Sequence, residues 1–305
     1  MYTPAITGTG VFTPENIITN AELVAAFNAY ADKQNDKNAD KIAAGEIEPL
    51  QHSSEEFILK ASGIENRYVM DKSGVLAPDV MHPLLRQRSD DEPGIMTEMA
   101  VDACKKALAQ AGRKAEDVDL VICAASNHER AYPAIAIEVQ HELGIKGTGF
   151  DMLVACSAAT FALQRASDAI AAGSARAVLV INPELTSPQV NYRDRDSHFI
   201  FGDVATAMVL ETAETCTSAH AYDVLGSRSQ TVFSNNIRSN FGYVSYAQDV
   251  DPYCEENLFH QNGRSVFKEV CPMAAEHLMD QIERVGLEVG DVKRWWLHQA
   301  NINMN

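Results

Sequence analysis

Two segments of this chain repeat one pattern at a constant offset: a helix end marked by glycine, a short turn with an acidic residue, and an apolar strand. The first copy covers residues 109–124 and the second covers residues 283–298. Gly112 corresponds to Gly286, and Asp117 corresponds to Asp291. A glycine commonly ends a helix, and a continuous apolar run is typical of a strand buried on both faces. The repeat predicts two similar halves, residues 1–216 and 217–305.

Helices and strands alternate in the pattern from residue 96 onward. This alternation predicts a parallel sheet covered by helices. A strand at 6–12 and a helix from Asn20 to about Tyr30 precede it. The polar segment 31–52 reads as an insertion or a helical extension, and the proline-containing segment 71–93 reads as an insertion that forms a surface loop. The predicted helices are 96–111, 133–143 and 157–173, and the predicted strands are 118–125, 148–154 and 176–182.

Composition excludes several classes of protein. With 46% hydrophobic residues, the 305-residue chain can fill a core, and no apolar run reaches the roughly 18 residues of a membrane span. The N-terminus lacks the pattern of a signal peptide. The six cysteines are scattered without a CxxC pair, as in a cytoplasmic protein with reduced thiols. A net charge of −17 argues against nucleic acid as the main partner.

Cys156 is the first candidate for chemistry. It lies between the predicted strand 148–154 and the predicted helix 157–173. A thiol at a helix N-terminus is close to the positive end of the helix dipole and to free backbone N–H groups, which favour the thiolate. A thiolate is a nucleophile suited to thioesters. A buried structural cysteine is the alternative.

His298 is the second candidate. It ends the apolar run Arg294-Trp-Trp-Leu-His298, which we predict to be a buried strand. Open α/β sheets bind ligands at the carboxyl ends of their strands, so a histidine there can face a site. An ordinary core or surface histidine is the alternative.

Around these two residues the chain resembles the thiolase-like condensing enzymes, most closely β-ketoacyl-[acyl carrier protein] synthase III. The resemblance implies an α/β fold in which duplicated βαβαβ halves form a layered α-β-α-β-α core. Matching motifs follow one another over nearly the whole chain. They are Ser53 to Ile58, Ser62 to Arg67, Val154 to Ala158, Asp194 to Thr206, Asn262 to Lys268 and His298 to Asn301.

The resemblance implies a decarboxylating Claisen condensation in fatty acid biosynthesis, with no cofactor and no metal site. Cys156 would take the acyl group of an acyl-coenzyme A. His298, as a neutral hydrogen-bond donor, would help to decarboxylate malonyl-[acyl carrier protein]. The family also uses an asparagine, expected near position 330, and a glycine-rich segment. Both would lie beyond Asn305, so we expect the second half to be incomplete in this chain.

The resemblance also implies binding residues and a homodimer. Tyr132 would close the acyl pocket of a partner subunit, although ordinary interface packing would explain it equally well. Arg264 and Lys268 would form a basic patch for acyl carrier protein, unless they merely belong to a solvated helix face. The residues implied for coenzyme A and substrate binding are Phe57, Ser62, Tyr132, Arg195, Gly263, Ala300 and Asn301.

Departures from the family pattern concern the acyl donor. Phe57 stands where acetyl-coenzyme A users have tryptophan, and Ala61 stands where they have an arginine. These two changes predict a lower affinity for the nucleotide part of coenzyme A. Burial of a medium or longer acyl chain would compensate for the lost binding free energy, so such a donor is favoured. Two other readings stay open: acyl-cysteine chemistry with another acceptor (a second acyl chain, an amine or an alcohol), and a non-catalytic homologue.

Overall fold

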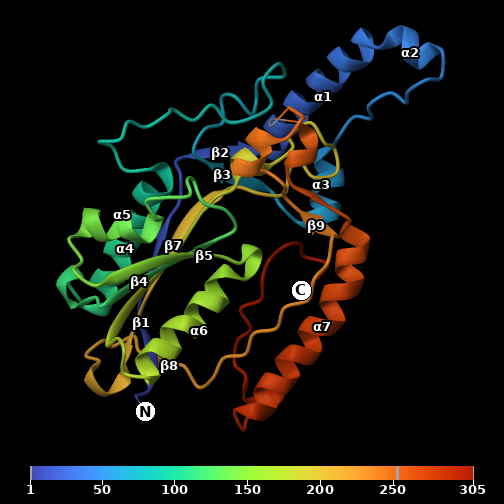
Figure 1. The fold of residues 1–305 in the computed structure, drawn as a ribbon. Helices are drawn as coiled ribbons and strands as arrows, with labels where there is room; N and C mark the ends of the chain where they lie inside the picture. Colours follow the sequence, from blue (N-terminus) through green and yellow to red (C-terminus); the bar gives the residue numbers. More distant parts are fainter. Residues whose placement is uncertain (1, 252–253, 305) are drawn as a thin grey trace.

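The computed structural model describes residues 2–251 and 254–304, and its centre is a six-stranded mixed sheet (Figure 1). The strand order is β5-β4-β6-β7-β1-β8, so β5 forms one edge. Strands β4, β5 and β6 are parallel, as the alternating pattern predicts, whereas β7 runs antiparallel to both β6 and β1. The strands are β1 (Pro4–Phe12), β4 (Leu120–Ala125), β5 (Thr148–Leu153), β6 (Ala177–Leu185), β7 (Asp203–Thr212) and β8 (Tyr222–Asp223).

Helices cover both faces of this sheet. Side chains alternate between the faces along each strand. Cys123 of β4 therefore joins the core under α4 (Ile95–Ala111) and α5 (Ile135–Leu143), while its neighbour Ile122 packs on the side of α6 (Ala158–Ala171). These three helices agree with the predicted ones to within a few residues.

Two glycines of β1 allow α4 to lie directly on the sheet. A Cβ atom added at Gly8 would come within 2.2 Å of the carbonyl oxygen of Ala107, and one added at Gly10 within 2.0 Å of that of Ala103. No side chain fits such distances, so glycine is required at both positions. The close contact between α4 and β1 positions α4 on one face of the sheet.

A second core lies beside one end of the sheet. It is formed by α1 (Asn20–Lys37), α3 (Glu55–Ser62) and the antiparallel pair β2 (Asn16–Thr19) and β3 (Asn66–Val69). A capping box between Thr19 and Glu22 starts α1. The predicted end near Tyr30 is too early: α1 continues to Lys37 and is followed by α2 (Ala39–Ala43), so the polar segment is a helical extension that projects outward (Figure 1).

The repeated segments have the same backbone conformation at their helix ends. Gly112 and Gly286 have φ values of 65° and 74°, and each follows a helix. Two residues later, the backbone N–H of Lys114 donates to Asp117, and that of Glu288 donates to Asp291, both at 2.9 Å. The local repeat is therefore real, while the division into two halves stays a prediction.

After Val292 the two copies differ. The predicted strand at 292–298 is wrong: these residues have no regular structure, and Trp296 is 86% exposed. A strand requires a hydrogen-bonded neighbour, and none of the strands in the described ranges pairs with this segment. The remaining elements are β9 (Ile237–Arg238), β10 (His260–Gln261) and α7 (Gly263–Arg284). None of the described helices is long and apolar enough to cross a membrane.

Candidate active site

Cys156 lies at a sharp turn between β5 and α6, as predicted. Strand β5 ends at Leu153, a 3-10 turn covers Ala155–Ser157, and α6 begins at Ala158. Ala155 has φ of 46°, in the left-handed region that residues with a Cβ atom rarely adopt. The tight turn leaves Cys156 exposed at the N-terminal end of α6.

The helix position of Cys156 predicts a lowered thiol pKa, and the structure shows that this prediction is wrong. Although residue 156 is exposed overall, protein atoms packed around the sulfur raise the pKa of the Cys156 thiol, and the negative charge of Glu184 adds to this, while the backbone N–H of Cys156 acts in the opposite direction. Burial also raises the pKa of Glu184, which accepts hydrogen bonds from the backbone N–H and the hydroxyl of Ser126. The thiol is therefore mainly protonated near neutral pH.

His298 lies in the irregular segment that follows Val292, and its residue is exposed. Partial burial of the ring lowers the pKa of His298 below its usual 6.5, so the imidazole is neutral at pH 7. Among the described residues, no hydrogen bond joins His298 to Cys156 or to any other side chain. His298 thus has a neutral ring at pH 7, and no hydrogen bond among the described residues joins it to Cys156.

The residues after His298 pack against the end of α3. The backbone N–H of Ile302 donates to the carbonyl oxygen of Ser62 at 3.1 Å, and the Asn301 side chain accepts from the backbone N–H of Asn303 at 2.7 Å. Two of the predicted binding positions, Ser62 and Asn301, therefore lie on adjacent segments. Ala300 next to them is half-buried.

Phe57 and Arg195, two of the residues implied for coenzyme A binding, are stacked directly on each other. The guanidinium carbon of Arg195 lies 3.8 Å from the centre of the Phe57 ring, and its Nε atom donates to the carbonyl oxygen of His52 at 2.8 Å. Stacked carbon atoms lie about 3.5–4.0 Å apart, so no third ring fits between the two. An adenine can enter only after Arg195 moves.

Two buried basic groups, Arg67 and His198, were given no role by the sequence analysis. Arg67 donates from Nε to the carbonyl oxygen of Phe199 at 2.7 Å, and burial lowers its pKa to about 10. His198 bonds through Nδ1 to the carbonyl oxygen of Arg195 at 2.8 Å, and burial lowers its pKa to about 4. Both hold the backbone of the 195–199 segment. Only the motif spacing around Arg67 hinted at this role.

Asp203 anchors the strand that follows this segment. Its carboxylate is buried and accepts hydrogen bonds from the backbone N–H groups of Met70, Thr186 and Ser187 and from the Ser187 hydroxyl, at 2.8–2.9 Å. The glycine-aspartate pair of the predicted motif is therefore a connection between β3, β6 and β7. It fixes the framework of the site rather than its chemistry.

The remaining predicted residues lie on the surface. Arg264 and Lys268 are exposed one turn apart on α7, so they can share a face, and Gly263 begins that helix. Tyr132 is 85% exposed. The structure does not bring these residues together with Cys156.

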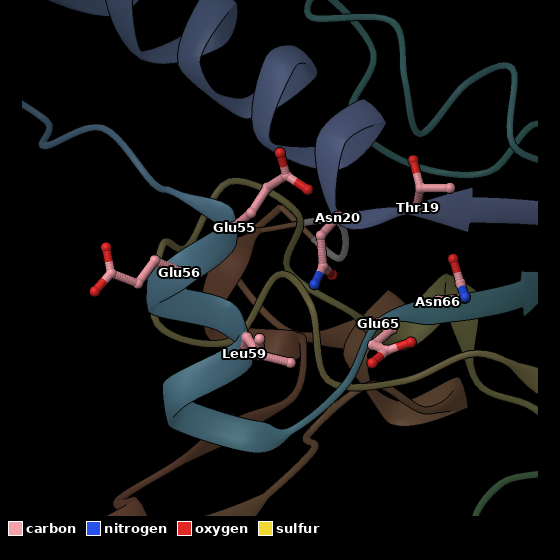
Figure 2. A pocket seen from close by; sticks show the side chains of 7 residues that line it. All are labelled: Thr19, Asn20, Glu55, Glu56, Leu59, Glu65 and Asn66. Atoms are coloured by element: carbon pink, nitrogen blue, oxygen red, sulfur yellow. The ribbon is translucent and has the colours of Figure 1, made fainter.

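A hollow of about 390 Å³ lies beside α3, and its lining is acidic. Figure 2 shows its glutamates on α3 and on the segment that leads into β3. Carboxylates repel the phosphates of a nucleotide, so this hollow is unsuited to coenzyme A. Its lining residues are Thr19, Asn20, Glu55, Glu56, Leu59, Glu65 and Asn66.

Comparisons with known proteins support one family. Residues 150–229, which include Cys156, match the family model of 3-oxoacyl-[acyl-carrier-protein] synthase III. The chain is 52% identical to the β-ketodecanoyl-[acyl-carrier-protein] synthase of Pseudomonas aeruginosa over 92% of this chain and 80% of the relative. It is 30% identical to the β-ketoacyl-[acyl-carrier-protein] synthase III of Bordetella petrii over 98% of this chain and 77% of that protein.

The fold agrees with these sequence matches. The crystal structure of 3-oxoacyl-[acyl-carrier-protein] synthase III from Aquifex aeolicus superposes with a TM-score of 0.66 at 26% identity, covering 99% of this chain and 78% of the other. The predicted thiolase-like α/β fold is thereby confirmed at the level of a central mixed sheet with helices on both faces.

Proposed function

The chain belongs to the β-ketoacyl-[acyl carrier protein] synthase III family of condensing enzymes, and on this premise we propose that it joins a medium-chain acyl group to malonyl-[acyl carrier protein] with loss of carbon dioxide. The observation that carries the proposal is the exposed Cys156 at the β5–α6 turn, inside the matched segment 150–229. The 52% identity to a β-ketodecanoyl synthase supports a medium-chain donor. Because a decanoyl product contains two carbons from malonate, we propose an eight-carbon acyl-coenzyme A.

In the first step, the sulfur of Cys156 attacks the thioester carbonyl of the acyl donor. A new carbon–sulfur bond forms, the bond to coenzyme A breaks, and the thiol proton of Cys156 passes to the departing coenzyme A thiolate. The N-terminal end of α6 favours the negative charge that develops beside it. Because the pKa of this thiol is raised, removal of the proton and attack on the carbonyl must be closely linked.

In the second step, malonyl-[acyl carrier protein] loses carbon dioxide and its carbanion attacks the acyl-cysteine. The new carbon–carbon bond forms as the bond from carbon to the Cys156 sulfur breaks, and the Cys156 thiolate regains a proton from solvent. We propose that the neutral ring of His298 donates a hydrogen bond to the enolate oxygen that forms during decarboxylation. Its lowered pKa supports this role, because an imidazolium would be the minor form at neutral pH.

The binding side is proposed from the α3 region. Phe57 offers a ring for the adenine, and Arg195 already contacts that ring. Ala61 provides no cation for the phosphates, so affinity must come from elsewhere. Each buried methylene contributes about 0.8 kcal/mol, and two to four of them would replace one charged contact of roughly 1.5–3 kcal/mol.

A homodimer and a carrier-protein surface complete the proposal. Strand β5 forms an open edge of the sheet, and Leu153 on it is 60% exposed, close in sequence to Cys156. Open apolar edges are normally covered, and a second copy of β5 would cover this one and bring Tyr132 toward the partner's acyl pocket. Arg264 and Lys268 offer positive charge to an acidic carrier protein.

Acylation by octanoyl-coenzyme A tests the proposed function. The parent protein should gain one octanoyl group on the peptide that carries Cys156, and malonyl-[acyl carrier protein] should then release β-ketodecanoyl-[acyl carrier protein]. Cys156→Ala should abolish the adduct, whereas Cys216→Ala should keep it. An adduct on another cysteine with an active Cys156→Ala protein refutes the nucleophile. Acylation without any product from malonyl-[acyl carrier protein] favours a different acceptor, and no acylation favours a non-catalytic homologue.

A further inference from the structure

Three side chains with metal-binding atoms, none of which has a role in the proposed reaction, lie close together near the N-terminal end of α5. They are Cys123 on β4, His128 in the loop after β4, and Asp151 on β5, and one ligand atom of each lies within 4.8 Å of the other two. Cys123 and Asp151 are register partners in the parallel pair β4–β5, so the sheet itself places them side by side. The cluster is built from two strands and a loop rather than from one sequence motif.

The distances fit shared ligands better than a direct bond. His128 Nδ1 lies 3.6 Å from Asp151 Oδ2, which is too long for a hydrogen bond. Two atoms about 2.1 Å from a tetrahedral zinc ion are about 3.4 Å apart. The other ring nitrogen of His128, Nε2, is buried and has no partner within the described part of the chain. Neither ring nitrogen of His128 thus has a hydrogen-bond partner among the described residues, so either one is free to act as the ligand atom.

Asp151 retains lone pairs for a cation. Its Oδ2 accepts the backbone N–H of Ile135 and its Oδ1 accepts that of Ala136, both at 2.8 Å. Each carboxylate oxygen can accept two bonds. The side chains of His128 and Asp151 are 13% and 11% exposed, while Cys123 is fully buried. A cation therefore has an approach from solvent, and a water molecule can complete its coordination from that side.

We propose that Cys123, His128 and Asp151 bind a transition-metal dication of the zinc class. One thiolate, one imidazole and one carboxylate are the ligands that zinc combines, whereas calcium and magnesium require oxygen ligands. On binding, the Cys123 thiol loses its proton to solvent. The ion would tie β4, β5 and the start of α5 together on the strand that leads to Cys156. This site goes beyond the proposed condensation and departs from the expectation of no metal site.

Zinc binding to untagged protein in a Cys156→Ala background tests the site, because the exposed active-site thiol cannot then act as a ligand. Equilibrium dialysis against zinc chloride, followed by metal analysis, should give one bound zinc per chain. His128→Asn should weaken this binding by at least about tenfold to a hundredfold, while His220→Asn, which alters an exposed histidine, should leave it unchanged. Equal affinity in His128→Asn and its parent overturns the proposal.

Two further measurements keep the test independent of folding defects. Cobalt(II) bound to the parent should show thiolate-to-metal charge-transfer absorption, and Cys123→Ser should lose it. Zinc should raise the thermal midpoint of the parent and not that of His128→Asn, because only the folded site binds the ion. Absence of both the charge-transfer band and the thermal shift in the parent refutes the site, whatever the outcome for condensation.

Discussion

The substitution Ala61→Arg should increase the affinity of this enzyme for acyl-coenzyme A. Ala61 follows Phe57 by one turn of α3, so the two side chains lie on the same face with about 5–6 Å between their Cβ atoms. An arginine at this position would extend toward the phosphates of a nucleotide whose adenine stacks on Phe57. It would restore the cation that the family resemblance implies and this chain lacks.

The magnitude follows from the exposure of the position. A hydrogen bond to a charged group contributes about 1.5–3 kcal/mol when it is buried. Ala61 is only half-buried, and exposed ion pairs contribute about 0.2–1 kcal/mol. We therefore expect about 1 kcal/mol, which corresponds to roughly fivefold in affinity. The contact between Arg195 and Phe57 must break before an adenine binds, both in Ala61→Arg and in the unmodified protein. The free energy lost with this contact, about 0.5–1 kcal/mol, therefore cancels when the two proteins are compared.

The assay is kcat/KM for acyl-coenzyme A donors of two to twelve carbons, compared with acyl-pantetheine donors, which lack the nucleotide. Ala61→Arg should raise kcat/KM about fivefold for every acyl-coenzyme A without changing the preferred chain length, and it should have no effect on acyl-pantetheine. Leu59→Arg is the matched control, since it adds the same charge at an exposed position on another face of α3. An equal gain with Leu59→Arg, or any gain with acyl-pantetheine, refutes contact with the phosphates.

Three other predictions follow. His298→Ala should still be acylated, but its rate of malonyl decarboxylation should fall on the order of 100- to 1,000-fold. In the unmodified protein this rate should decrease with falling pH only below pH 6.5, because the lowered pKa of His298 keeps its ring neutral to lower pH. Asp203→Ala should cost about 3–5 kcal/mol in urea unfolding, since it leaves three backbone N–H donors unpaired, whereas exposed Asp196→Ala should cost little. Light scattering should show a dimer, and Tyr132→Ala should change which acyl-chain length is preferred. A fully active monomer would contradict the proposed dimer.

The turn around Cys156 was predictable because its signals are local. An apolar strand, a run of small residues and an alanine-rich helix follow one another along the chain, so no distant contact is needed to place the cysteine between them. The prediction that Phe57 and Arg195 bind coenzyme A rested instead on the family resemblance. The sequence did not show that the two side chains stack directly on each other and leave no room for a third ring between them.

Two predictions that depended on contacts with distant segments of the chain were wrong. The run 292–298 has the apolar pattern of a buried strand, yet it forms none, because strand structure depends on a neighbouring strand rather than on side chains alone. The thiol pKa was predicted from the helix dipole, but the charge of Glu184 and the surrounding protein atoms act in the opposite direction. Glu184 reaches this site from β6, which its sequence position does not reveal.

The sequence by itself determined the alternation of helices and strands between residues 96 and 182, the position of Cys156 at the β5–α6 turn and the family, because these follow from neighbouring residues and motif spacing. Tertiary structure alone decided that β7 runs antiparallel, since strand direction within a sheet is set by connections and not by composition. It also decided that Cys123, His128 and Asp151 meet, because the register of β4 with β5 joins residues that are distant in the chain.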